Sequence, residues 1–209
     1  MTFRFYVVAL LFVLAIVGMG GCSRAPVERG HSDLESLGVG IARELSVFLA
    51  DGDRVVVFTT PGALGQGAEA ERAAVNGLAD SLKSRNISVL AVEYRQEDID
   101  AFYQQQTSYL IEAFAAGPME RAGGRNAQAF VSFAGWPNAA WLPANSVLAA
   151  VDWNPAAVAP RWKDYRAIIL VAPKAITDAA TAPERRLHQR PEQALAWFDQ
   201  RFDVEVRTR

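Results

Sequence analysis

The chain has 209 residues, of which 51% are hydrophobic, and its 21 basic residues nearly balance its 23 acidic residues. Because no basic stripe stands out, we expect no nucleic-acid partner. A chain with one cysteine forms no internal disulfide, so its stability has to come from a packed core.

The first 21 residues predict a signal peptide. Arg4 is the only charged residue among them, and the apolar region Phe5–Val17 has the size typical of a signal peptide. This region is short for a membrane span, which needs about 20 apolar residues. Small residues follow, and Cys22, the single cysteine, comes directly after Gly20 and Gly21.

This arrangement resembles the signal of bacterial lipoproteins, in which the peptide is cut just before the cysteine and the thiol then carries a lipid. Met19 stands where that family usually has leucine. The resemblance implies an acyl (palmitate-type) anchor on Cys22 and a periplasm-facing position in the cell envelope. Ser23 in place of an aspartate favours the outer membrane over the inner one. The alternative is an uncleaved N-terminal anchor with an incidental cysteine.

The lipoprotein interpretation divides the chain into three parts. Residues 1–21 are the signal peptide, residues 22–32 are the lipidated cysteine and a short polar tether, and residues 33–209 form a single domain. The length of the third part is ordinary for one domain.

The domain opens with a predicted helix. Ser32 and Glu35 have the spacing of a capping box, and Gly52 within Asp51–Asp53 allows the left-handed turn that ends the helix. Between these signals, apolar residues recur at helical spacing, namely Leu34, Leu37, Ile41, Leu45 and Phe48.

Six strands are predicted after this helix. The first five are apolar runs, and the last alternates strictly, which is typical of a half-exposed edge strand. They cover residues 54–59, 87–93, 127–133, 147–151, 167–172 and 202–207.

Three further helices are predicted between these strands. The first follows a glycine-rich loop, the second begins near Glu97 and ends at Gly117-Pro118, and the third begins at Pro191. Inward-facing positions are Ala74, Leu78 and Leu82 in the first, and Leu195, Phe198 and Phe202 in the third.

Strands separated by helices of this length predict an α/β fold. We expect a mainly parallel, Rossmann-like sheet of five or six strands with helices on both faces. The connections between residues 134 and 166 carry prolines and no long helix, so the sequence leaves their topology open.

The loop Thr59–Gly67 lies between a predicted strand and a helix, where backbone N–H groups can hold an anion. Its segment Thr60–Gly67 is similar to the cofactor-binding turn of short-chain dehydrogenases, but Pro61 replaces the first glycine of that pattern, and the Tyr-x-x-x-Lys pair of that family is missing. We therefore expect no cofactor. The alternative is that the glycines only allow a tight turn from strand to helix.

The same region also resembles one lobe of periplasmic sugar-binding proteins. The segments that carry this resemblance are Val55–Gly62, Val75–Lys83 and Ile87–Val92. In that family the loops after the strands contact the ligand. The resemblance therefore implies Thr60 and Gly62 as candidate ligand-binding residues.

An aromatic segment provides the second group of candidates. Four of the five tryptophans follow the third and fourth predicted strands, so some of them should lie near the carboxyl edge of the sheet, where α/β folds bind ligands. Exposed indoles could stack on sugars or contact a partner protein. The alternative is a structural lid over the sheet. The candidate residues are Trp136, Asn138, Trp141, Asp152, Trp153 and Asn154.

Catalysis is the competing interpretation. Ser132, Asp152 and His188 occur in the chain order of α/β-hydrolases, although Ser132 lacks the G-x-S-x-G elbow. His31, the other histidine, falls in the predicted tether, and no histidine pair has metal-ligand spacing. We therefore predict a lipid-anchored envelope protein whose non-catalytic domain binds a partner protein or a small ligand. The alternative is a secreted hydrolase.

Overall fold

The structure is a computed structural model and describes residues 31–63, 65, 69–94, 96, 126–133, 142–143, 145–151, 165–174, 187–188 and 190–209. Its α-helices are α2 (Asp33–Ser46), α3 (Glu69–Leu82) and α6 (Pro191–Arg201), with a 3-10 turn η1 (Lys83–Arg85). Its strands are β1 (His31–Ser32), β2 (Arg54–Thr59), β3 (Ser88–Glu93), β4 (Ala129–Ser132), β5 (Val147–Val151), β6 (Ala167–Pro173), β7 (Leu187–His188) and β8 (Phe202–Thr208).

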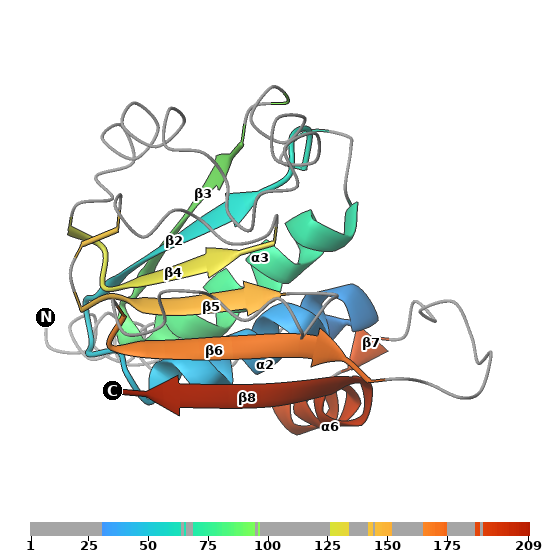
Figure 1. Cartoon of the computed structure of the whole chain (residues 1–209). Helices are drawn as coiled ribbons and strands as arrows, with labels where there is room; N and C mark the ends of the chain where they lie inside the picture. Colours follow the sequence, from blue (N-terminus) through green and yellow to red (C-terminus); the bar gives the residue numbers. More distant parts are fainter. Residues whose placement is uncertain are drawn as a thin grey trace, which may run out of the picture.

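Six strands form one sheet in the order β3-β2-β4-β5-β6-β8 (Figure 1). The first five are parallel to their neighbours, and β8 runs antiparallel to β6. This architecture confirms the predicted α/β fold with a mainly parallel sheet. It also settles the topology that the sequence left open, because β4, β5 and β6 are consecutive parallel neighbours.

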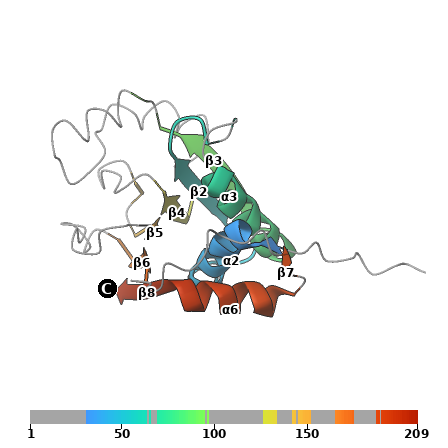
Figure 2. The same ribbon diagram turned by 90° about the vertical axis from the view of Figure 1, so that its right-hand side faces the viewer.

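Both faces of the sheet are buried, as expected of parallel strands. Alternate residues of β2 point to opposite faces: Val55 and Val57 belong to the core beneath the helices, whereas Val56 and Phe58 belong to a second core on the other face. The three helices named above all lie on the first face (Figure 2). The helix predicted from Glu97 falls outside the described residues.

Helix α2 occupies the middle of the helical layer and contacts both α3 and α6. The predicted capping box is present: the Glu35 backbone N–H donates to Ser32 Oγ at 3.2 Å, and the Ser32 N–H donates to Glu35 Oε2 at 2.7 Å. The helix ends at Ser46, before the predicted stop, and Gly52 has the expected positive φ of 84°. Just at and beyond this end, the Arg85 guanidinium donates to the backbone carbonyl oxygens of Ser46 and Leu49.

Two glycines allow α2 and α3 to pack backbone to backbone. A Cβ built on Gly38 of α2 would lie 1.8 Å from the backbone oxygen of Ala74. A Cβ built on Gly77 of α3 would lie 2.1 Å from the backbone oxygen of Glu35. No larger residue fits either position at this helix separation.

The chain enters the domain through a two-stranded sheet in which β1 pairs with β7 in antiparallel register, His31 opposite His188. The first described residues were expected in the tether, but they pair with a segment more than 150 positions further along the chain. A hydrogen bond reinforces the pairing, since His188 Nε2 lies 2.5 Å from Asp33 Oδ1 and both side chains are largely buried. The packed domain therefore begins at or before His31.

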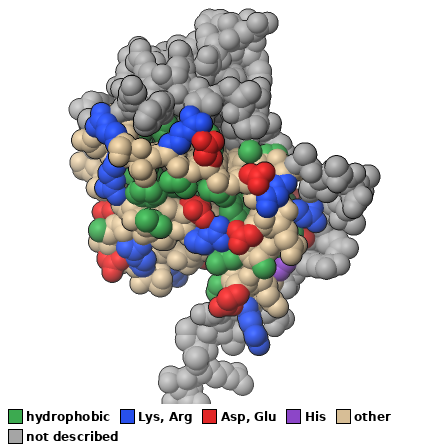
Figure 3. Space-filling view, turned by 60° about the horizontal axis from the view of Figure 1, so that its bottom comes forward, with side chains coloured by type: hydrophobic (Ala, Val, Ile, Leu, Met, Phe, Trp, Pro, Cys, Tyr) green, Lys and Arg blue, Asp and Glu red, His purple; other side chains and the backbone are tan. Residues whose placement is uncertain are grey.

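The C-terminal segment, α6 and β8, has the burial that its sequence pattern predicts. Phe198 of α6 is fully buried, Leu195 and Phe202 are half-buried, and β8 is an edge strand that alternates between half-buried and exposed residues along most of its length. On the face shown in Figure 3, basic, acidic and apolar side chains are interspersed. Among the helices that the structure describes, none is long and apolar enough to cross a bilayer.

Candidate functional site

The strand order places a topological switch point between β2 and β4. The chain leaves β2 for β3 on one side and later returns past β2 to form β4 on the other. Loops that follow the two strands at such a point diverge, and open α/β sheets bind their ligands at this position. Here the loop after β2 begins at Thr60, and the chain after β4 begins at Phe133.

Thr60 lies where the sequence placed it, but both of its donors are already used. Its backbone N–H donates to Glu71 Oε2 and its hydroxyl donates to Glu71 Oε1, each at 2.8 Å. Glu71 lies in the first turn of α3. A carboxylate of the protein thus accepts from both donors of Thr60, so the arrangement disfavours an anion bound to Thr60.

Glu71 was not among the candidate residues predicted from the sequence. Its signal was present, since Glu69 and Glu71 are acidic residues in the first turn of a predicted helix, where carboxylates are stabilised. The sequence did not show that the carboxylate would turn back to Thr60 across a loop. Such a contact depends on how tightly the loop folds.

Gly62 gives that loop its shape. It has a φ of 81°, a backbone conformation that glycine adopts without steric cost. Two turn hydrogen bonds surround it, from the Ala63 N–H to the Thr60 oxygen at 3.2 Å and from the Gly65 N–H to the Gly62 oxygen at 3.1 Å. The Arg72 guanidinium donates to the Gly65 oxygen. These contacts support the simpler interpretation, in which the glycine serves the turn.

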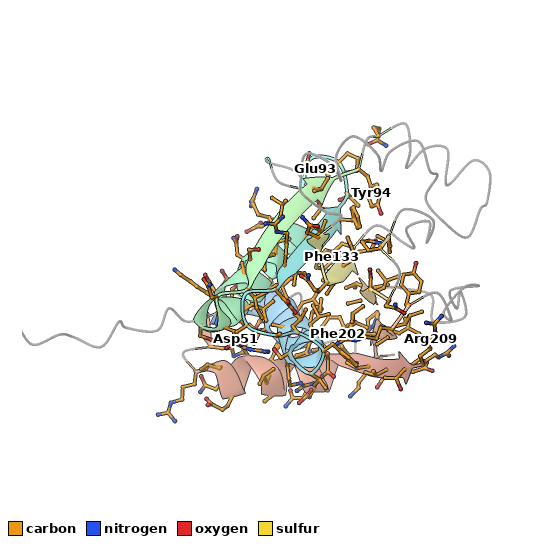
Figure 4. The ribbon with its side chains drawn as sticks, turned by 90° about the vertical axis from the view of Figure 1, so that its left-hand side faces the viewer. Asp51, Glu93, Tyr94, Phe133, Phe202 and Arg209 are labelled. Atoms are coloured by element: carbon orange, nitrogen blue, oxygen red, sulfur yellow. The ribbon has the colours of Figure 1, made fainter. Side chains whose placement is uncertain are left out.

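An aromatic stack lies beneath the same edge on the face away from the helices. The Tyr94 and Phe58 rings are 5.3 Å apart, and the Phe58 and Phe130 rings are 6.1 Å apart, both in stacked arrangements. Figure 4 shows Glu93 and Tyr94 together at the end of β3, with Tyr94 on the side away from the helices. The three rings are buried in one apolar cluster beneath this edge.

The hydrolase interpretation is weakened at two of its three residues. Ser132 is fully buried at the end of β4, so a substrate cannot reach its hydroxyl. His188 lies in β7, where its Nε2 contacts Asp33. Asp152 lies outside the described residues.

All six residues of the predicted aromatic site lie outside the described residues, and so does Cys22. Within the part of the chain that it does describe, no group of three or more histidine, cysteine, aspartate and glutamate side chains could hold a metal ion. The residues outside the described part are Trp136, Asn138, Trp141, Asp152, Trp153 and Asn154.

No protein-family model matches the chain, and no curated protein matches it. Among solved structures, it is similar to a periplasmic ribose ABC transporter from Conexibacter woesei (15% identity, TM-score 0.44, covering 68% of this chain and 46% of that one). It is also similar to a putative LacI transcriptional regulator from Bacteroides fragilis (11%, 0.43, covering 84% and 59%). A third match is a sugar-binding protein of a sugar ABC transporter from Bacillus halodurans (14%, 0.42, covering 86% and 62%).

The chain spans about half to three fifths of the length of these proteins. The fold assignment rests on the strand order and pairing described above rather than on these matches.

Proposed function

We propose that this protein is a lipid-anchored lipoprotein of the bacterial envelope whose α/β domain binds a partner protein or a small ligand without catalysis. The observation that carries the proposal is the uncharged run Phe5–Gly21 ending at Cys22, the single cysteine of the chain. The structure adds that the packed domain begins by His31, so Cys22 precedes it by only a few residues.

Lipid attachment is tested by expression in bacteria supplied with radiolabelled palmitate. We expect the wild-type chain to take up label and to sediment with membranes, and Cys22→Ser to do neither, because the acyl chains attach through the thiol. A Cys22→Ser chain that still carries label would refute the anchor. Density-gradient separation of the two membranes then checks the proposed outer-membrane location.

The switch point is the proposed binding position. Topology favours this edge, and the tryptophan-containing segments follow β4 and β5, two of the strands that end there. Glu71 already satisfies Thr60, and Glu93 adds a second carboxylate at the end of β3, so a neutral ligand or a partner surface suits the edge better than a phosphate or carboxylate.

Binding is tested by capture from detergent-solubilised membranes with the anchored form as bait. The matched control is the triple variant Trp136→Ala, Trp141→Ala and Trp153→Ala. We expect a specific partner to be retained by the wild type and lost with the variant, provided that both baits show the same unfolding transition. Equal capture by the two baits would remove the tryptophans from the proposed site.

A further inference from the structure

The point at which the chain enters the domain is held firmly. Ser32 is paired with Leu187, capped by Glu35, and bonded through its carbonyl to the Ser36 hydroxyl at 2.9 Å. The neighbouring Asp33 is bonded to His188. Any freedom between a lipid on Cys22 and the domain is therefore confined to residues 23–30.

Eight residues reach only a short distance whatever their conformation. Nine Cα-to-Cα steps separate Cys22 from His31, so a fully extended chain spans about 30 Å. A flexible chain of this length has a root-mean-square span of about 15–18 Å. The β1–β7 sheet is thus held close to the surface that carries the lipid.

The opposite end of the domain lies farther from the surface that carries the lipid than the β1–β7 sheet does. β7 and the C-terminal end of β8 lie at opposite ends of the molecule in Figure 1, and Figures 1 and 2 together show that α6 runs toward the sheet, roughly perpendicular to it, whereas β8 runs within the sheet. The 11 residues of α6 are about 16 Å long, and the seven of β8 are about 24 Å long. Thr208 therefore lies on the order of 25–30 Å from the entry point, so it touches the bilayer only if the tether is almost fully extended.

We propose that the corner formed by β1, β7 and the first turn of α6 is the membrane-facing surface of the anchored domain. The amino edge of the sheet, where β8 ends, then points away from the bilayer. This inference rests on the proposed lipid anchor. It adds the orientation of the domain relative to the bilayer. A partner bound at the amino edge of the sheet comes from the aqueous side, whereas a partner at the β1–β7 corner is part of the membrane or lies against it.

The orientation can be measured by energy transfer to an acceptor dye on lipid headgroups. The lipidated protein is purified and reconstituted into vesicles, with a donor dye on one engineered thiol, either Glu192→Cys at the start of α6 or Thr208→Cys at the end of β8. Both positions are exposed, and the thioether on Cys22 leaves the new thiol as the only one to label. We expect roughly twofold stronger transfer from position 192, because the two positions differ by about 25 Å in distance from the bilayer.

A matched control lengthens the tether. About 20 inserted Gly and Ser residues after Ser23 raise its root-mean-square span to about 30 Å, so the difference between the two positions should largely disappear. Equal or reversed transfer with the native tether would overturn the orientation. Flotation of the vesicles separates this failure from failure of the anchor itself, because a chain without lipid does not float with them.

Discussion

His188 makes a largely buried side-chain contact with Asp33. Its Nε2 lies 2.5 Å from Asp33 Oδ1, and the side chains of the two residues are 14% and 4% exposed. An ionised carboxylate only accepts hydrogen bonds, so a bond to ionised Asp33 requires the tautomer in which His188 Nε2 donates. The pair joins the beginning of α2 to β7, a strand close to the C-terminus. It therefore connects two distant parts of the chain at the point where the chain enters the domain.

Removing the imidazole should destabilise the domain. His188→Ala leaves the Asp33 carboxylate buried without this partner, and we expect a loss of about 1–3 kcal/mol in the free energy of unfolding. Urea denaturation measures the loss. His31→Ala, opposite in the same ladder, is the control and should cost less. In the double variant His188→Ala with Asp33→Asn, part of the loss should return; an unchanged loss would mean that the bond contributes little.

The sequence identified His188 only as a possible catalytic base and assigned His31 to the tether. The structure places both residues in a ladder that the sequence did not predict. β1 and β7 are two residues long and carry no periodic pattern, so only the tertiary fold shows that they pair. Ser132 is the reverse case, because its burial could have been inferred from its place at the end of an apolar strand.

Among the elements, the α2–α3 contact depends most strongly on residue size. We expect Gly38→Ala to cost about 1–3 kcal/mol or more, because the new methyl group meets the backbone of Ala74 rather than a movable side chain. Thermal unfolding measures the loss. Gly52→Ala is the comparison, since nothing lies within 4 Å of its position and its cost of about 1–2 kcal/mol comes from the left-handed backbone alone. A Gly38→Ala chain as stable as the wild type would show that the helices can separate.

Helices α2 and α6 are joined by an ion pair that makes stability depend on pH. The hydrogen bonds from Arg43 hold the pKa of Asp199 below the usual aspartate range, and the charges of Arg43 and Lys174 act in the same direction. A carboxylate whose pKa is lowered by folding stabilises the protein above its unfolded pKa and loses this contribution as the pH falls through the folded pKa.

Asp199→Asn should therefore lower the free energy of unfolding by about 0.2–1 kcal/mol at neutral pH, since both side chains are partly exposed. The difference from the wild type should shrink below about pH 4. Urea titrations between pH 2.5 and 7 test this, with Asp80→Asn as the exposed control. A difference that stays constant over the whole range would contradict the pairing.

For the six main strands and the three described helices, the sequence was a good guide, because long apolar runs, a capping box and Pro191 each act locally. It was a poorer guide where partners are distant. It placed the end of α2 too late and did not show Arg85 donating to the Ser46 carbonyl oxygen there, and it proposed Thr60 as a ligand contact without showing Glu71. Hydrophobic pattern predicts elements, whereas side chains that reach between elements are set by the assembled fold.

At the scale of the whole molecule, the proposed lipid anchor is chemically distinct from the folded domain, and a very short segment connects the two. With the proposed anchor, a tether of eight residues keeps the β1–β7 corner, where the chain enters the domain, nearest the bilayer. Lengthening this segment should leave stability unchanged and alter only the reach of the domain, which the energy-transfer comparison above measures.

The edge strand β8 also bears on contacts between copies of the protein. Its ladder partner is β6, and Asp203 and Glu205 are exposed along it, with Arg207 half-exposed beside them. The proposed lipid anchor would concentrate copies in two dimensions, a condition under which open strand edges recruit one another into growing aggregates. Charges spaced along such an edge make that recruitment unfavourable, so neighbouring copies can crowd together on one membrane without their sheets merging.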